Sequence, residues 1–348
     1  MVPSYYLFRY PYAAIWHALK AAGRLDPVVL YCANTLDWQL FQPVQKHLPP
    51  IPVVAQNKRA QAELAAMGVE SKTLPIFPAG VIMMRQAAYR FPTPALRKVG
   101  MRHGPFVFKR FANPVGYNML DRFLMTSSHE VDLAKQHGIT VGRAVGFPKL
   151  DPALDGSIGE VELAPLRKQA GLDNDKPTVL FTATWDESGV SAVDRWCARL
   201  SELTSDFNVV VTVHPWTTEE YLRQIDAADG VFRIAGPDVV PWIMLADVCV
   251  GDSSSILAEC CALDKPLITF QLADHPRLVP ETMKLVDEMS EQISGFDELP
   301  AALQRSINEP ANQASARQRV RGLMFESVDG SAGERAAREI RAVFPELR

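Results

Sequence analysis

The chain is 348 residues long, which exceeds one ordinary domain and favours two domains of about 150 residues each. Hydrophobic residues make up 47% and charged residues 22% of the composition, and no apolar run reaches the ~20 residues of a membrane span. The five cysteines form no CxxC pair and no metal-ligand spacing, and the N-terminal residues lack a signal-peptide pattern. We therefore expect a reduced, cytoplasmic location.

The net charge of −4 conceals opposite balances in the two halves. Residues 1–150 contain 18 Lys and Arg against 7 Asp and Glu, whereas residues 151–348 contain 18 against 33. This asymmetry indicates an anionic partner for the first half, for which nucleic acid, a membrane surface and a phosphorylated acceptor all qualify. Docking on the acidic half of another chain is the alternative. Nucleic acid fits less well, because the sequence contains no recognised nucleic-acid-binding module.

Short apolar runs alternate with helical patterns along the whole chain, which is typical of parallel sheets covered by helices. In the first half, strands are predicted at 27–32, 51–55, 73–77, 98–102 and 122–126, and helices at 38–47, 59–67 and from Ser128. In the second half, strands are predicted at 179–184, 209–213, 231–235, 248–250 and 267–270, and a helix at 193–203. We predict an α/β protein of two Rossmann-like domains, residues 1–150 and 151–348, that face each other across a cleft, with the final helix crossing back.

The stretch that follows the predicted strand 248–250 carries the strongest site signal. A polar turn with three consecutive serines opens a helix, and orphan N–H groups and hydroxyls at a helix start stabilise an anion such as phosphate. Capping of the helix by Ser253 or Ser254 is the structural alternative. The residues expected to contact a ligand here are Asp252, Ser253, Ser254, Ser255 and Glu259.

Two histidines occupy matching positions in the two halves. His103 follows the strand 98–102 and His214 follows the strand 209–213, so both lie at carboxyl strand ends, where open α/β sheets bind ligands. Imidazole exchanges protons near neutral pH, which suits acid–base catalysis or binding of a phosphate oxygen; a histidine satisfied by a backbone carbonyl is the alternative. Lys109 could neutralise a phosphate or belong to a solvated basic face. One Asp-x-Asp motif occurs at 173–175, but it precedes the strand 179–184, away from the expected cleft, so a solvated turn is favoured and neither a metal nor a cofactor is expected.

With these residues, the chain resembles the CDP-glycerol glycerophosphotransferase family of teichoic-acid and capsule polymerases, whose fold is glycosyltransferase-B-like. The resemblance spans residues 98–340, with Pro105 where the family has threonine and Asp186 where it usually has a basic residue. The similar stretches, in order, are Arg102-His103-Gly104-Pro105 with Lys109, Gly146 to Asp151, Phe181 to Trp185, Val213-His214-Pro215, Asp252 to Ser255 with Glu259, and Asp329 to Arg335.

The resemblance implies transfer of glycerol phosphate, or a related alditol phosphate, from a CDP-activated donor to a hydroxyl acceptor in cell-surface polymer synthesis, with release of CMP. It implies that His103 is the general base, that His214 and the serine turn hold the donor pyrophosphate, and that Glu259 binds ribose hydroxyls. The basic first half would then attract an anionic or lipid-linked acceptor, or the anionic membrane surface that carries it, at which the protein would be peripheral. Further substrate contacts are expected from Gly104, Lys109, Thr184, Pro215 and Arg335. The alternatives are a nucleotide-sugar glycosyltransferase or UDP-sugar 2-epimerase of the same fold, and a non-catalytic nucleotide-binding partner.

Overall fold

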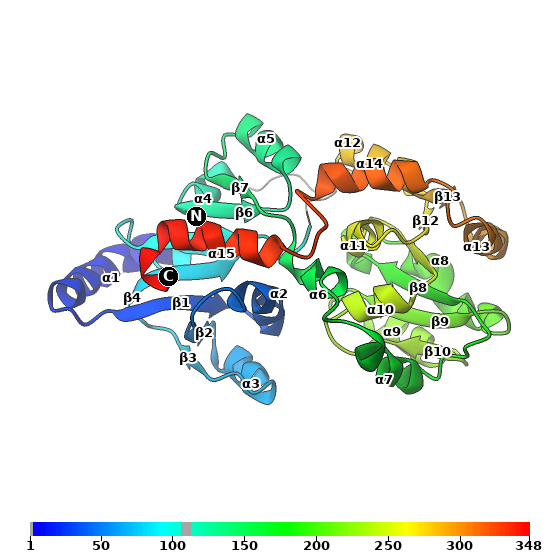
Figure 1. The fold of residues 1–348 in the computed structure, drawn as a ribbon, viewed down its shortest axis with the longest axis horizontal. Helices are drawn as coiled ribbons and strands as arrows, with labels where there is room; N and C mark the ends of the chain where they lie inside the picture. Colours follow the sequence, from blue (N-terminus) through cyan, green and yellow to red (C-terminus); the bar gives the residue numbers. More distant parts are fainter. Residues whose placement is uncertain (1–2, 86, 106–112) are drawn as a thin grey trace. The chain divides into compact units, whose positions relative to one another are not determined.

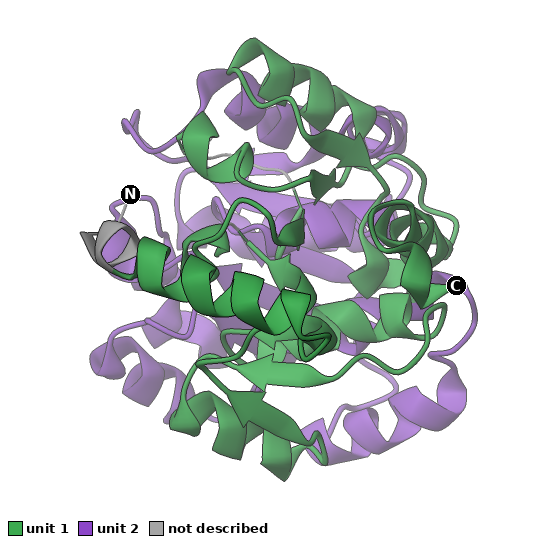
Figure 2. Cartoon of the chain, turned by 90° about the vertical axis from the view of Figure 1, so that its left-hand side faces the viewer, with its two compact units in different colours: residues 1–106, 111–151, 325–348 green, residues 107–110, 152–324 purple. Residues whose placement is uncertain are grey.

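A computed structural model describes residues 3–85, 87–105 and 113–348 (Figure 1). The chain forms two compact units, which Figure 2 colours separately. Unit 1 contains the described residues up to Asp151 together with Phe325–Arg348, and unit 2 contains Pro152–Met324. Unit 1 is therefore assembled from both ends of the sequence.

Unit 1 is built on a seven-stranded parallel sheet with the order β3-β2-β1-β4-β5-β6-β7. The strands are β1 (Asp26–Cys32), β2 (Val53–Ala55), β3 (Ser71–Thr73), β4 (Pro78–Met84), β5 (Arg97–Met101), β6 (Arg122–Met125) and β7 (Gly142–Ala144). The helices are α1 (Pro3–Ala21), α2 (Thr35–Gln45), α3 (Lys58–Ala66), α4 (Pro114–Tyr117), α5 (Ser128–Gln136) and α15 (Ala332–Val343), with short 3-10 turns at Ala88–Arg90, Pro148–Leu150 and Pro345–Leu347. The strand order reverses between β1 and β4, and such switch points are where open sheets bind ligands.

Unit 2 repeats this plan with a six-stranded parallel sheet in the order β10-β9-β8-β11-β12-β13. The strands are β8 (Thr178–Ala183), β9 (Asn208–Val213), β10 (Val231–Arg233), β11 (Val248–Gly251), β12 (Leu267–Phe270) and β13 (Glu291–Ile293). The helices are α6 (Asp151–Leu154), whose first residue closes unit 1, α7 (Glu160–Ala170), α8 (Val193–Trp196), α9 (Glu219–Asp226), α10 (Val240–Leu245), α11 (Ile256–Ala262), α12 (Pro280–Met289), α13 (Leu299–Asn308) and α14 (Ala314–Met324). Short 3-10 segments lie at Asp186–Ser188, Cys197–Leu203 and Phe296–Glu298. The switch point of unit 2 falls between β8 and β11.

The C-terminal helix α15 packs against α2, β5 and β6 in unit 1. Just beyond it, the fully buried ring of Phe344 lies on the backbone of Gly80 in β4, where an added Cβ would come within 2.2 Å of the ring. A glycine is required at this position because any side chain would displace the aromatic ring. The close contact explains how the last residues of the chain complete the core of the first unit.

Most of the predicted strands lie within a few residues of observed ones, and the prediction of mixed α/β structure with parallel sheets is confirmed. The strand predicted at 73–77 is wrong: β3 ends at Thr73, and the central strand β4 begins at Pro78. Strands β7 and β13 were not predicted, and the helix expected at 193–203 is α8 followed by a 3-10 segment. Within the described ranges, no helix combines the length and apolar character needed to cross a bilayer.

Candidate active site

The turn after β11 is organised by one buried carboxylate at the switch point of unit 2. Asp252 is 1% exposed and accepts hydrogen bonds from four backbone N–H groups, those of Thr184 (3.0 Å), Ala192 (3.0 Å), Ser253 (2.6 Å) and Ser254 (2.9 Å). Burial raises the pKa of Asp252, and the backbone donors oppose that rise. The side chain thus ties the end of β8 to the end of β11.

The three serines of this turn are placed differently. The Ser253 hydroxyl bonds to the Thr184 hydroxyl at 3.1 Å and donates to the carbonyl of Val190, and the Ser254 hydroxyl accepts from Thr182 at 3.1 Å. Both serines are buried, whereas Ser255 is exposed at the N-cap of α11. Among described groups, no backbone N–H of α11 bonds to the Ser255 side chain. Ser255 is therefore the serine whose hydroxyl faces solvent, and it does not serve as a helix cap.

The close approach of β11 to β8 depends on a glycine. A Cβ at Gly251 would lie 2.9 Å from both the Leu257 and the Thr182 side chains. Inside α11, Glu259 follows Ser255 by four residues, so both lie on the same side of the helix. The Glu259 side chain is only 3% exposed.

His214 lies directly after β9, the strand beside β8, and its ring orientation is fixed locally. Its Nδ1 accepts the backbone N–H of Trp216 at 3.2 Å, so a neutral imidazole carries its proton on Nε2. The Trp216 ring contacts the imidazole edge-on, with centroids 5.2 Å apart. Pro215 and Trp216 are both exposed. His214 is thus arranged as a hydrogen-bond donor through Nε2.

The loop after β8 supports the His214 turn from its other side. Trp185 packs edge-to-face on Trp216 at 5.3 Å, and the carboxylate of Asp186 accepts the backbone N–H of Thr218 at 2.9 Å and bonds its hydroxyl. Asp186, which departs from the family pattern, therefore anchors the turn that carries His214. Sequence analysis identified the departure but not its partner, because Thr218 lies on a different strand end.

In unit 1, His103 is exposed just beyond β5, and Gly104 beside it is half-buried. The preceding residue, Arg102, points into the unit and donates from Nε to Glu130 at 2.5 Å. The buried Glu130 carboxylate also accepts the backbone N–H of Thr126 at 2.9 Å. The backbone that presents His103 is therefore anchored by a buried ion pair. Lys109 lies outside the described residues.

The switch point of unit 1 contains a carboxylate that sequence analysis missed. Asp37, in the first turn of α2, is fully buried and accepts the N–H of Ala33 at 2.7 Å through Oδ2. Its Oδ1 accepts no hydrogen bond from the described residues and lies 3.9 Å from Nε of Arg85, at the end of β4. Burial raises the pKa of Asp37 to about 6. In the sequence, Asp37 is a single acidic residue in the first turn of a helix, where it is favourable because of the helix dipole, so it did not indicate a site.

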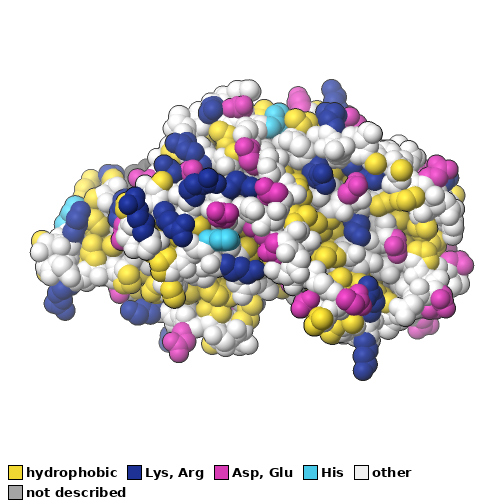
Figure 3. All heavy atoms as spheres, viewed as in Figure 1, with side chains coloured by type: hydrophobic (Ala, Val, Ile, Leu, Met, Phe, Trp, Pro, Cys, Tyr) yellow, Lys and Arg dark blue, Asp and Glu magenta, His cyan; other side chains and the backbone are white. Residues whose placement is uncertain are grey.

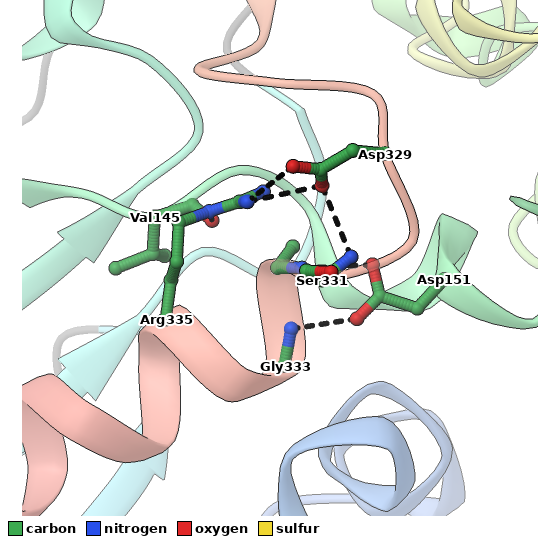
Figure 4. A network of polar contacts seen from close by, with 7 residues as sticks. Val145, Asp151, Asp329, Ser331, Gly333 and Arg335 are labelled. Carbon is green, nitrogen blue, oxygen red and sulfur yellow. Dashed lines mark hydrogen bonds and ion pairs between the residues drawn. The ribbon is translucent and has the colours of Figure 1, made fainter. Parts of the chain in front are cut away.

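Arg335 was expected to contact substrate, but the structure gives its guanidinium other partners within unit 1 (Figure 4). Its Nε donates to the carbonyl of Val145 at 2.9 Å, and its Nη1 pairs with Asp329 at 2.8 Å. Nearby, Asp151 accepts the backbone N–H groups of Ala332 (3.1 Å) and Gly333 (2.6 Å) at the start of α15. The stretches Gly146 to Asp151 and Asp329 to Arg335 are thus joined within unit 1, and the substrate contact expected of Arg335 stays a prediction.

Two Rossmann-like units with polar residues at the strand ends define an α/β protein of the glycosyltransferase-B type. A model of the CDP-glycerol:poly(glycerophosphate) glycerophosphotransferase family matches residues 119–342, so the chain belongs to that family. This confirms the predicted family and enzyme class. No curated protein sequence matches the chain.

Solved structures with the same fold include the wall teichoic acid polymerase TagF. One TagF variant soaked with CDPG is 13% identical, with a TM-score of 0.72 over 98% of this chain and 99% of that one. A UDP-N-acetylglucosamine 2-epimerase described as putative, from Listeria monocytogenes, is 11% identical, with a TM-score of 0.64 over 93% and 98% of the two chains. At these identities the likeness shows the fold alone, and it confirms the predicted fold class.

Proposed function

We propose that the protein transfers glycerol phosphate, or a related alditol phosphate, from a CDP-activated donor to a hydroxyl acceptor and releases CMP. The observation that carries the proposal is the family match, which covers Pro152–Met324 of unit 2 and therefore includes His214, the serine turn and Glu259. The epimerase and sugar-transferase alternatives rest on fold likeness alone, at 11% and 9% identity.

In the proposed reaction, the acceptor hydroxyl oxygen attacks the phosphorus that bears glycerol, the phosphorus–oxygen bond to the CMP phosphate breaks, and His103 takes the hydroxyl proton. His103 suits this role because its ring is exposed at a strand end while Arg102 anchors its backbone. Imidazole titrates close to neutral pH, so it can accept a proton there.

We assign the leaving phosphate to His214 and Ser255. The protonated Nε2 of His214 donates to a phosphate oxygen, and the exposed Ser255 hydroxyl supplies a second donor. Phosphoryl transfer depends on positioning and on stabilising charge at the leaving group, so donors held in place by protein contacts contribute most. Thr184, Asp252, Ser253 and Ser254 then support the turn, and Glu259 binds a ribose hydroxyl at the same side of α11.

The test is CMP release from CDP-glycerol by the wild type and by His103→Ala and His214→Ala. A loss of about 10²–10⁴-fold is expected for removal of a general base. Asp229→Ala, an exposed residue of unit 2 remote from these strand ends, is the control and keeps wild-type turnover. An unchanged rate in His103→Ala would exclude it as the base, and no CMP release by the wild type with any acceptor would exclude the proposed reaction.

We also propose that α1 attaches the protein to an anionic membrane surface, on the cytoplasmic side, where a lipid-linked acceptor lies. Its inner face is held by Trp16, whose Nε1 donates to the carbonyl of Pro78 at 2.8 Å. Among its described side chains, Phe8, Tyr10 and Ile15 are exposed at 58, 77 and 48%. No acidic residue precedes Asp26 in the sequence. Exposed aromatic and apolar groups with nearby basic residues favour an anionic bilayer interface.

Figure 3 shows further Lys and Arg side chains gathered around α15 of unit 1, in keeping with an anionic acceptor. The membrane proposal is tested by co-sedimentation with phosphatidylglycerol vesicles at low and high salt, with phosphatidylcholine vesicles as the control. Binding is expected to phosphatidylglycerol at low salt and to weaken in Phe8→Ser/Tyr10→Ser. Wild-type protein that stays in the supernatant at low salt would contradict it.

A further inference from the structure

Unit 2 contains a cavity of about 970 Å³ to which the proposed function gives no ligand. Its wall is formed by the loop 271–278 after β12, by the first turns of α12 and by Gln292 of β13, and at one end it reaches Asp252. The cavity thus opens at carboxyl strand ends beside the switch point of this sheet, where α/β folds bind ligands. Its volume is that of a site for a sizeable organic molecule.

The charge of the wall decides what the cavity can hold. Asp274 and Asp287 line it, and no Lys or Arg is present in its described lining. Neither carboxylate has a hydrogen bond or ion pair to any residue of the described chain, whereas the neighbouring Glu288 and Glu291 pair with arginines. A phosphate would be repelled here, so the wall favours a neutral group that brings its own hydrogen-bond donors.

A divalent cation is not favoured by the same residues. Across the described ranges, no three His, Cys, Asp or Glu side chains come together as a metal site would require. Met283 and Val286 of α12 add apolar surface to the wall. The combination of apolar surface and separated carboxylates suits the carbon skeleton and hydroxyl groups of a polyol.

Gln292 contributes an oriented acceptor to this wall. The Ser290 hydroxyl donates to the carbonyl of Val286 at 2.6 Å, so Ser290 offers lone pairs to its other neighbours. The Gln292 amide nitrogen donates to Ser290 at 2.9 Å and to the Thr269 hydroxyl. Both amide hydrogens are thereby used, which leaves the Gln292 carbonyl oxygen as the group available to a ligand donor. Asp274, Asp287 and the Gln292 carbonyl thus give the wall three hydrogen-bond acceptors for a hydroxyl-rich ligand.

We propose that this cavity binds the neutral alditol part of the activated donor, because the ribose is assigned to Glu259, with Asp274, Asp287 and Gln292 as its hydroxyl acceptors. The proposal rests on the proposed function, which places the donor pyrophosphate at Ser255, on the turn that Asp252 organises. Two neutral groups flank that pyrophosphate, the ribose of the nucleotide and the alditol, and both present vicinal hydroxyls.

The test is calorimetric binding of CDP-glycerol, CDP and glycerol 3-phosphate to the wild type and to Asp274→Ala/Asp287→Ala. Removal of hydrogen bonds to charged acceptors is expected to weaken binding at least about tenfold. With the alditol in the cavity, the double variant should bind CDP-glycerol more weakly while its affinity for CDP is unchanged; equal weakening of both ligands would place the ribose there instead and overturn the proposal. Met283→Trp, which fills the cavity, is expected to weaken binding of the same ligand, and Asp229→Ala, outside it, leaves all affinities unchanged.

The proposal is overturned if the double variant and Met283→Trp both bind CDP-glycerol and CDP with wild-type affinity while thermal unfolding confirms that they are folded. That result leaves the proposed function standing, because the wild type still binds its donor. Wild-type protein that binds neither nucleotide would overturn both proposals together.

Discussion

Removal of the Asp151 carboxylate is expected to loosen the attachment of the C-terminal helix to unit 1. Asp151 is 4% exposed and accepts the first two N–H groups of α15, at Ala332 and Gly333. Loss of a helix N-cap costs about 1 kcal/mol, and a second buried N–H left without an acceptor adds about 1–3 kcal/mol. We therefore expect Asp151→Ala to lower the unfolding free energy of unit 1 by about 2–4 kcal/mol.

The assay is urea unfolding combined with hydrogen exchange of peptides from α15. Asp151→Ala should lower the urea midpoint and speed exchange across 332–343, while peptides from unit 2 keep their protection. Asp132→Ala is the matched control, because Asp132 is exposed and pairs only with the exposed Lys135; it should change stability by no more than about 0.5 kcal/mol. If both variants unfold at the same urea concentration, or exchange in α15 is unaffected, the assigned role of Asp151 is wrong.

Three further predictions concern buried charges. Asp252→Ala leaves four backbone N–H groups without their acceptor and should lower the unfolding free energy of unit 2 in urea by at least about 3 kcal/mol. Ser255→Ala should instead lower the affinity for the donor and leave the unfolding free energy at its wild-type value. The reverse pattern would refute the assignment. Asp37, with its pKa raised to about 6, stays protonated in the folded chain between about pH 4 and pH 6, whereas in the unfolded chain it is ionised. The free energy of unfolding should therefore fall by about 3 kcal/mol as the pH rises through this window. Asp37→Asn should remove that fall, which urea midpoints of both proteins at pH 4.5 and 7 would show. Glu130→Gln leaves Arg102 buried without its counter-charge and should cost about 3–5 kcal/mol by urea unfolding, and a cost near zero would show that the pair is not essential.

Several of the strands predicted from sequence have apolar residues that are mostly β-branched. The run 209–213 is an example, and it lies entirely within β9. The central strand β4 was missed because Pro78, Gly80 and two methionines are weak strand formers. Its stability comes from pairing with β1 and β5 on either side and from Phe344, which is more than 250 residues away in sequence. A partner so distant in sequence could not be predicted from the local residue pattern.

The position of the polar turn at Asp252 could also be predicted, because a strand followed by Gly-Asp and three serines has a local signature. The sequence did not predict which of the three serines faces solvent. The buried positions of Ser253 and Ser254 are set by Thr184, Val190 and Thr182, all on the β8 segment. In the same way, the sequence favoured a surface position for Arg335, because it does not show that the side chain contacts Val145 and Asp329.

The two-part origin of unit 1 has a consequence for how the chain folds as it is synthesised. All of Pro152–Met324 is made before α15 and Phe344, so the second unit has its complete sheet and helices while the first still lacks the ring that covers Gly80. Domains usually fold in the order in which they are made, the N-terminal one first. In this protein unit 1 is completed after unit 2, and its sheet lacks the contacts of α15 and Phe344 until residues 332–344 have been made.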